Sequence, residues 1–256
     1  MSLWTSIKGV AGVRGRGCLP DRPDARDATF RVLSPRLGVS VPALTSDWEE
    51  HVAVQDQGAT NSCVGQSLAQ AAFVQMAVDG WGDRRFFPSA HAIYSWARAY
   101  TGMQTQDIGT HIRDGARAMK QFGFPPESAW PSKPRTVNVV PNITAYKAAA
   151  DQRKLAGYYR IPRGDTLAIR LALTAGKPVV FGLQLRESFL DGNEKVIDVD
   201  RGRELGGHAM TICGHWGDDF RAVSSWGTTW RDNGKCWISE RRIREEAMDL
   251  WCCDLL

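Results

Sequence analysis

The chain has 256 residues, of which 43% are hydrophobic and 23% are charged, and its formal net charge is +4. This composition is typical of a folded globular protein and excludes a disordered or fibrous one. The small positive excess gives no clear nucleic-acid or membrane signal. The length predicts one large domain or two smaller lobes.

The first 17 residues are rich in glycine and contain Lys8, Arg14 and Arg16 but no acidic residue. We interpret residues 1–17 as a basic N-terminal extension, either a solvated tail or an arm that contacts a protein partner. The segment has no apolar stretch of the signal-peptide type. We therefore expect synthesis in the cytoplasm and free thiols at all six cysteines.

Helical patterns fill the first part of the domain that we expect at residues 18–256, and strand patterns fill its last part. Residues 63–81 carry apolar side chains at helical spacing, at Ala69, Ala72, Phe73 and Met76. Further helices are predicted at residues 88–101, 110–122, 142–155 and 166–175. Strands are predicted at residues 178–185, 208–216, 220–226 and 235–239. The order predicts an α+β fold with two lobes, a mainly helical one at about 45–160 and a mainly β one at about 161–256.

Cys63 begins the first long helix and follows two good N-cap residues, Asn61 and Ser62. The positive end of a helix dipole favours a thiolate, which is the nucleophilic form of cysteine. On this local pattern alone, a buried structural cysteine is the more common outcome.

A nucleophilic thiol needs a base, and His208 lies 145 residues after Cys63, at the start of a predicted strand. Gly206 and Gly207 precede it, and two glycines let a substrate backbone come close. A histidine that serves only the structure of a strand is the simpler interpretation of this residue alone. The sequence argues against a metal site shared by His208 and His215 on one strand, because the two positions differ by an odd number and face opposite sides.

Four motifs occur in a fixed order: Leu19-Pro-Asp-Arg-Pro-Asp-Ala-Arg-Asp27, Gln57-Gly-Ala-Thr-Asn-Ser-Cys63, Leu205-Gly-Gly-His-Ala-Met210 and Ser225-Trp-Gly-Thr-Thr-Trp230. Together they resemble the papain-like cysteine peptidases, from about residue 18 to the C-terminus. The resemblance is strongest to the bacterial and viral branch that lacks a long propeptide. It implies a helical left lobe, an antiparallel β-barrel-like right lobe and a site in the cleft between them.

The resemblance also implies a role for each matching residue. Cys63 would attack a peptide carbonyl and His208 would handle the proton, through a covalent acyl-enzyme. Gln57 and the Cys63 amide would form the oxyanion hole. Two further positions complete the implied site: Gly109 would bind substrate backbone and Trp226 would roof the histidine. The family needs no metal or cofactor, and its partners are peptide or protein substrates.

Ser224 is a departure from the family, which has asparagine immediately before Ser-Trp-Gly. A serine oxygen can accept a hydrogen bond from the imidazole but reaches less far than an amide. We expect a His208 ring nitrogen within hydrogen-bonding reach of Ser224 or of a water. The loss of such a bond to a charged group costs about 1.5–3 kcal/mol, which predicts a weakened enzyme. The alternative is a binding or structural component on the same fold, for example in a phage or virion assembly.

Overall fold

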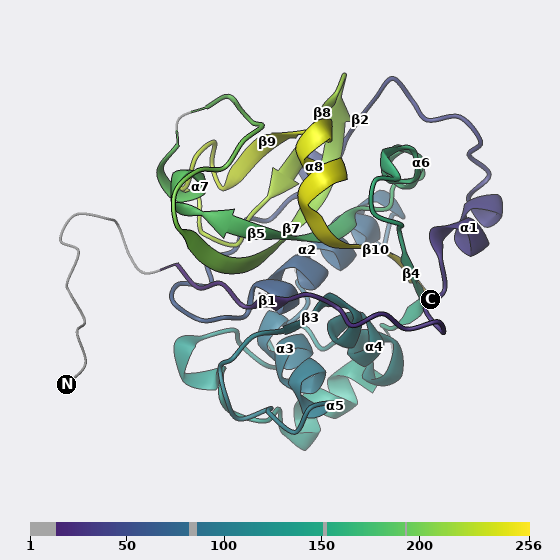
Figure 1. The fold of residues 1–256 in the computed structure, drawn as a ribbon. Coiled ribbons are helices and arrows are strands. Elements are labelled where there is room, and N and C mark those ends of the chain that lie inside the picture. The colour runs from purple at the N-terminus through teal and green to yellow at the C-terminus, as the bar shows by residue number, and fades with distance from the viewer. Residues whose placement is uncertain (1–13, 82–85, 151–152, 193) are drawn as a thin grey trace.

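The computed structural model describes residues 14–81, 86–150, 153–192 and 194–256, and these form two lobes side by side (Figure 1). One lobe is helical and the other is built on a sheet. The α-helices are α1 (Phe30–Leu33), α2 (Cys63–Val78), α3 (Ala90–Ala99), α4 (Ile112–Phe122), α5 (Ile143–Ala150), α6 (Thr166–Thr174), α7 (Glu187–Asp191) and α8 (Glu240–Glu246). Short 3-10 helices cover Ser34–Leu37, Glu49–His51 and Pro134–Thr136. None of the helices in the described ranges is long and apolar enough to span a bilayer.

The large sheet follows the strand order β4-β10-β5-β7-β8-β9-β6, and β2 pairs with β7 beside this path. Its strands are β2 (Thr45–Asp47), β4 (Leu155–Arg160), β5 (Val179–Arg186), β6 (Val196–Ile197), β7 (Glu204–Trp216), β8 (Asp219–Val223), β9 (Lys235–Ser239) and β10 (Ala247–Leu255). All these pairings are antiparallel except β6 with β9. The α+β prediction is confirmed, although in the described residues the path ends at β4 and β6, so the sheet is open and not a closed barrel.

Helix α2 lies between the lobes and is buried along almost its whole length, at 14 of its 16 residues. It packs against α3 and α4 on one side and against β7 on the other. Gly65 is required at the α3 contact, because a Cβ there would lie 2.3 Å from the Ala90 carbonyl oxygen. The helix that carries Cys63 is therefore fixed by both lobes.

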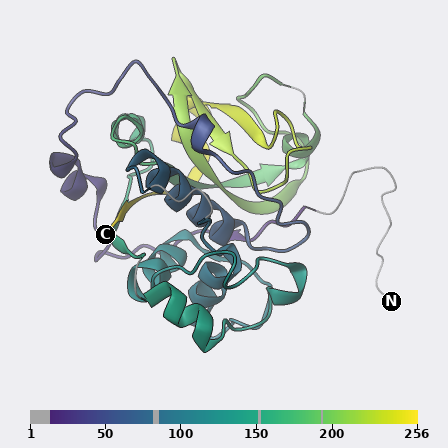
Figure 2. The same ribbon diagram turned by 180° about the vertical axis from the view of Figure 1, so that it is seen from behind.

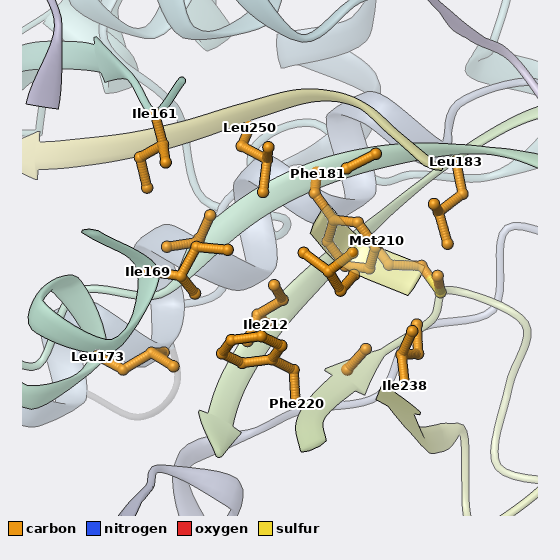
Figure 3. Packing of buried hydrophobic residues seen from close by; sticks show 14 of the residues in the cluster. Ile161, Ile169, Leu173, Phe181, Leu183, Met210, Ile212, Phe220, Ile238 and Leu250 are labelled. Carbon is orange, nitrogen blue, oxygen red and sulfur yellow. The ribbon is translucent and has the colours of Figure 1, made fainter. Parts of the chain in front are cut away.

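The core of the β lobe lies between the sheet and α6. Ile169 and Leu173 of α6 face Ile212 of β7 and Phe220 of β8, with Phe181 of β5 beside them (Figure 3). These side chains are all at most 1% exposed. Burial of this apolar surface, at about 25 cal/mol per Å², makes the sheet a rigid support for the residues at its edge.

The N-terminal part of the chain, which precedes the residues of both lobes in sequence, crosses between the two lobes. Strand β1 (Cys18–Leu19) pairs in parallel with β3 (Thr110–His111) at the edge of the helical lobe. The segment runs across the front of the molecule in Figure 1, and in the view from behind α2 lies in front of it (Figure 2). This crossing places residues far from Cys63 in sequence directly against it.

Candidate active site

Cys63 is the first residue of α2 and is fully buried. Its sulfur accepts a hydrogen bond from the Gly17 amide at 3.3 Å and one from the Ala209 amide, next to His208. Burial raises the pKa of the Cys63 thiol, and these amide bonds oppose the rise. In this conformation the cysteine is therefore a neutral thiol.

The predicted N-caps of α2 act differently from the expectation. Ser62 occupies the N-cap position, but its side chain makes no cap and instead shares a hydrogen bond with Thr60 Oγ1 at 2.8 Å. Asn61 Oδ1 accepts the Arg16 amide at 3.1 Å, and Asn61 Nδ2 donates to the Asp107 carbonyl. Ser62 is thus the N-cap residue, as predicted, but neither side chain makes a capping hydrogen bond, because both bond to neighbouring loops.

His208 lies on β7 and is fully buried. Its Nε2 lies 3.0 Å from Ser224 Oγ, whereas Nδ1 has no hydrogen-bond partner in the described residues. The ring stacks on Trp226, with centroids 4.1 Å apart and planes 21° apart. The expectation of a Ser224 contact under a tryptophan roof is confirmed. Burial, with the charge of Arg16 adding to it, lowers the pKa of His208 to about 3, so the imidazole is neutral at pH 7.

Gln57 points its amide nitrogen toward the groove, where Nε2 donates to the Gly15 carbonyl at 3.2 Å and to Thr60 O. Ser225 sets this orientation, because its hydroxyl donates to Gln57 Oε1. Ser225 belongs to the Ser225–Trp230 motif, but the motif alone predicted no role for this residue. Its position next to Ser224 was the available signal.

Two glycines predicted to bind substrate lie so close to the backbone of residues 17–18 that neither position has room for a Cβ. A Cβ on Gly109 would lie 2.3 Å from the Gly17 oxygen, and one on Gly207 would lie 2.0 Å from the Cys18 oxygen. Gly109 has a φ of +86° and donates its amide to the Tyr94 hydroxyl at 2.8 Å. The structure thus places five of the seven predicted site residues directly against one segment of the chain, and His208 and Ser224 lie next to them.

We call this segment, residues 14–19, the cleft segment. Gly15 donates to the Gly58 carbonyl at 2.9 Å, and its own carbonyl also accepts Trp226 Nε1 at 3.2 Å. The Gly17 carbonyl accepts the Thr110 amide at 2.8 Å. The interpretation as a solvated tail is wrong for residues 14–17, because they fill the groove between the lobes. Lys8 lies outside the described residues.

Arg160 anchors the chain that follows the cleft segment. Its guanidinium bonds Asp21 at 3.0 Å, Asp27 at 2.9 Å and Asp249 at 2.6 Å. Trp251 Nε1 donates to the Asp21 carboxylate at 2.7 Å. The expectation that residues 19–27 pack on the core is therefore confirmed. The aspartates of the first motif attach this segment through their bonds to Arg160 and Trp251.

The sequence and the mixed fold have counterparts among known proteins. An uncharacterized peptidase C1-like protein of Acanthamoeba polyphaga mimivirus is 30% identical over an alignment of 270 positions, covering 93% of this chain and 86% of the viral one. This chain belongs to the papain-like, C1-type peptidase family. No protein-family model matches it.

Solved structures agree with this papain-like assignment. Xylellain, a cysteine protease from Xylella fastidiosa, superimposes with a TM-score of 0.80 at 26% identity, covering 98% of this chain and 99% of that one. Procathepsin B from Trypanosoma congolense superimposes with a TM-score of 0.74 at 15% identity, covering 94% of this chain and 86% of that one. The second likeness concerns the fold alone.

The remaining cysteines and histidines of this papain-like chain lie apart from the groove or in the core. All six cysteines are free and buried, including the adjacent Cys252 and Cys253, as expected. His215 lies 2.9 Å from Arg170 and is not joined to His208. The described residues contain no His, Cys, Asp and Glu cluster that could hold a metal ion.

Proposed function

We propose that this papain-like protein is a cysteine peptidase with Cys63 as its nucleophile. One arrangement carries the proposal. Cys63 lies at the N-terminus of a buried helix, its sulfur reaches the backbone next to His208, and the far nitrogen of that histidine is fixed by Ser224. A thiol, a base and a group that orients the base are the parts that nucleophilic catalysis needs.

The groups support a two-step hydrolysis. His208 Nδ1 takes the thiol proton, and the sulfur bonds to the peptide carbonyl carbon. Gln57 Nε2 and the Cys63 amide stabilise the oxyanion. The C–N bond then breaks as His208 returns its proton to the leaving amine. Water attacks the thioester, His208 accepts a proton from that water, and the acid product leaves with Cys63 restored.

This mechanism requires the cleft segment to leave the groove. A leaving amine must face His208, so the acyl half of a substrate must lie on the opposite side, along Gly109. The cleft segment has its earlier residue, Gly15, at Trp226 beside His208 and its later residue, Gly17, at Thr110. It therefore runs opposite to a substrate, and the described form is the closed form of the enzyme.

We further assign the chain to the bacterial and viral branch without a long propeptide. The support is the Leu19–Asp27 motif, whose aspartates bind Arg160, together with the likeness to a viral and a bacterial relative. This assignment favours peptides or unfolded proteins as the substrates.

The proposal is tested with a thiol-reactive epoxide at pH 6–7, followed by mass spectrometry and by assays with a mixed peptide library. We expect the label at Cys63 and peptide hydrolysis that the Cys63→Ala variant lacks. Hydrolysis that persists in Cys63→Ala would overturn the proposal.

A binding role without catalysis is the second candidate, and the filled groove favours it. If the epoxide leaves Cys63 unlabelled even after removal of residues 1–17, the second candidate replaces the first. The fold should survive that truncation, because the anchors on Arg160 come after residue 17.

A further inference from the structure

The Ser224 hydroxyl can either donate a hydrogen bond to His208 or accept one from it, whereas a carbonyl oxygen in the same place could only accept. If its hydrogen pointed at His208 Nε2, the ring proton would be on Nδ1, the nitrogen that has no partner and would face the thiol. A protonated Nδ1 cannot take the Cys63 proton. The hydroxyl hydrogen of Ser224 must therefore be directed to another acceptor for His208 to act as a base.

A small polar cavity lies directly behind Ser224, with a volume of about 10 Å³. This is the room that about one water molecule needs. Its walls come from α2 and the loop before it, from β7, and from the end of β8 with the two residues that follow. The lining residues are Gln55, Gln66, Ser67, Gln70, Thr211, Val223, Ser224 and Ser225.

Two side chains of this cavity have buried polar atoms without a partner. Gln66 Oε1 and Gln70 Nε2 make no hydrogen bond in the described structure, and the residues are 3% and 4% exposed. They are four residues apart on α2 and so lie on the same face. A buried amide atom without a partner is destabilising, and a water in the cavity is a partner that both atoms can reach.

We propose that Gln66 and Gln70 bind one water in this cavity and that the Ser224 hydroxyl donates a hydrogen bond to this water, so that Ser224 Oγ accepts a hydrogen bond from His208 Nε2. The water would accept from Ser224 and from Gln70 Nε2, and it would donate to Gln66 Oε1. Thr211 is a further acceptor in the wall, because its hydroxyl hydrogen is already donated to the Ser67 carbonyl at 2.9 Å. The water thus finds the three to four partners that buried waters have.

Gln66 and Gln70 are then positioning residues, which act on the reaction through Ser224 and select the His208 tautomer with a free Nδ1. This role rests on the proposed peptidase function, but the tautomer itself can be measured without activity. The closed form helps, because burial keeps His208 neutral at pH 7, so that one tautomer can be observed in the full chain.

The first test uses the unmodified full chain, with nitrogen-15-labelled histidine in NMR at pH 7 and a high-resolution crystal structure. We expect the proton of His208 on Nε2, and one ordered water within about 3.2 Å of Ser224 Oγ, Gln66 and Gln70. A proton on Nδ1, or a dry cavity, would overturn the proposal even if the protein proves to be a peptidase.

The second test compares Gln66→Leu and the double variant Gln66→Leu/Gln70→Leu with Gln75→Leu. Gln75 is buried on the same helix, but its amide faces Cys253 and Lys177. We expect the ratio of the Nδ1–H to the Nε2–H form to rise about tenfold in the first two, the effect of one neutral hydrogen bond. Gln75→Leu should leave the ratio unchanged.

A background without the hydroxyl separates this role from general packing. In Ser224→Ala the glutamine substitutions should no longer change the tautomer ratio, because no hydroxyl remains to be oriented. An equal shift with and without Ser224, or no shift with it, would show that the glutamines do not act through Ser224. If the double variant does not fold, Gln66→Leu alone decides the question.

Discussion

The Gly17 amide nitrogen lies 3.3 Å from the Cys63 sulfur, so a nitrogen and not a carbonyl carbon faces the nucleophile. An N–H that points at the sulfur places the sulfur near the plane of the peptide group, whereas attack on a carbonyl carbon comes from the face of that group, so the chain is not oriented for cleavage. With the cleft segment in place, Cys63 and His208 are both 0% exposed, and this burial outweighs the amide bonds and keeps the thiol and the imidazole neutral. In the proposed mechanism this closed form is therefore inactive, and the cleft segment is not a substrate of its own Cys63.

A side chain at Gly17 should open the groove. A Cβ there would lie 2.1 Å from the Asn61 carbonyl oxygen, and this backbone cannot move away from the start of α2. We expect Gly17→Val to expel the cleft segment and to increase the rate of epoxide labelling at Cys63 at least tenfold. Mass spectrometry of the labelled protein at fixed times measures the rate.

The matched control is Ala25→Val, the same type of change at an exposed position of the N-terminal segment. It should label at the rate of the unmodified chain. If Gly17→Val labels no faster than Ala25→Val while the unmodified chain reacts readily, the groove is already open in solution and the closed form is not inhibitory.

Acid should weaken the closed form. Its His208 has a pKa of about 3, against 6.5 for a free histidine, so the open state binds more protons over this range. Closure is fully favoured above about pH 6.5 and is lost progressively as the pH falls toward 3, by up to about tenfold per pH unit. The measurement is the labelling rate of the full chain divided by that of Gly17→Val.

That ratio cancels the intrinsic pH dependence of the thiol, because both proteins carry the same Cys63. We expect it to rise between pH 6 and pH 4. A ratio that is flat or falls over this interval would mean that His208 titrates no differently in the two states, and the inferred link between burial and closure would be wrong.

Arg160 should stabilise the fold through the carboxylates that it joins. Asp21 and Asp249 have side chains that are 0% and 4% exposed, and burial already raises the pKa of Asp21. Arg160→Ala would leave these carboxylates without their cation, so we expect a loss of about 3 kcal/mol in the free energy of unfolding at pH 7. Urea denaturation measures it.

The control is Arg241→Ala, which removes an ion pair with Asp198 in which both side chains are about half exposed. Such a pair contributes about 0–1 kcal/mol. Equal losses in the two variants would show that the anchor is an ordinary surface contact and that residues 20–27 are attached by other means.

The helices and strands with strong local patterns were predictable from the sequence, and the predicted strand at residues 235–239 matches β9. Strand β10 was not predicted, because its apolar run Leu250-Trp-Cys-Cys253 lacks the turn residues that mark a strand, and its partners β4 and β5 lie far away in sequence. Pairing between distant segments gives no local signal.

The site residues were predictable from motifs, whereas the use of the groove was not. Residues 14–17 have the composition of a solvated tail, and nothing in Arg-Gly-Arg-Gly indicates that both glycines are needed for close contact. A Cβ on Gly15 would lie 1.7 Å from the Thr60 oxygen, a constraint that only the folded neighbours impose. Likewise, the helical spacing of Gln66 and Gln70 does not indicate that they share a cavity with Ser224, which is more than 150 residues away in sequence.

Ser224 should contribute to catalysis less than Cys63 and more than a surface residue. Its oxygen lies 3.0 Å from His208 Nε2, so Ser224→Ala removes one bond to a ring that becomes charged in the reaction. Such bonds contribute about 1.5–3 kcal/mol, which predicts a fall of roughly one to two decades in kcat. The measurement is peptide hydrolysis in the Gly17→Val background, where the groove is open, with Cys63→Ala as the inactive reference. KM should change little, because Ser224 is only 2% exposed and lies behind the histidine.

A fall in kcat as complete as that of Cys63→Ala would mean that Ser224 maintains the fold of the site. An unchanged kcat would mean that the Trp226 stack alone orients the ring.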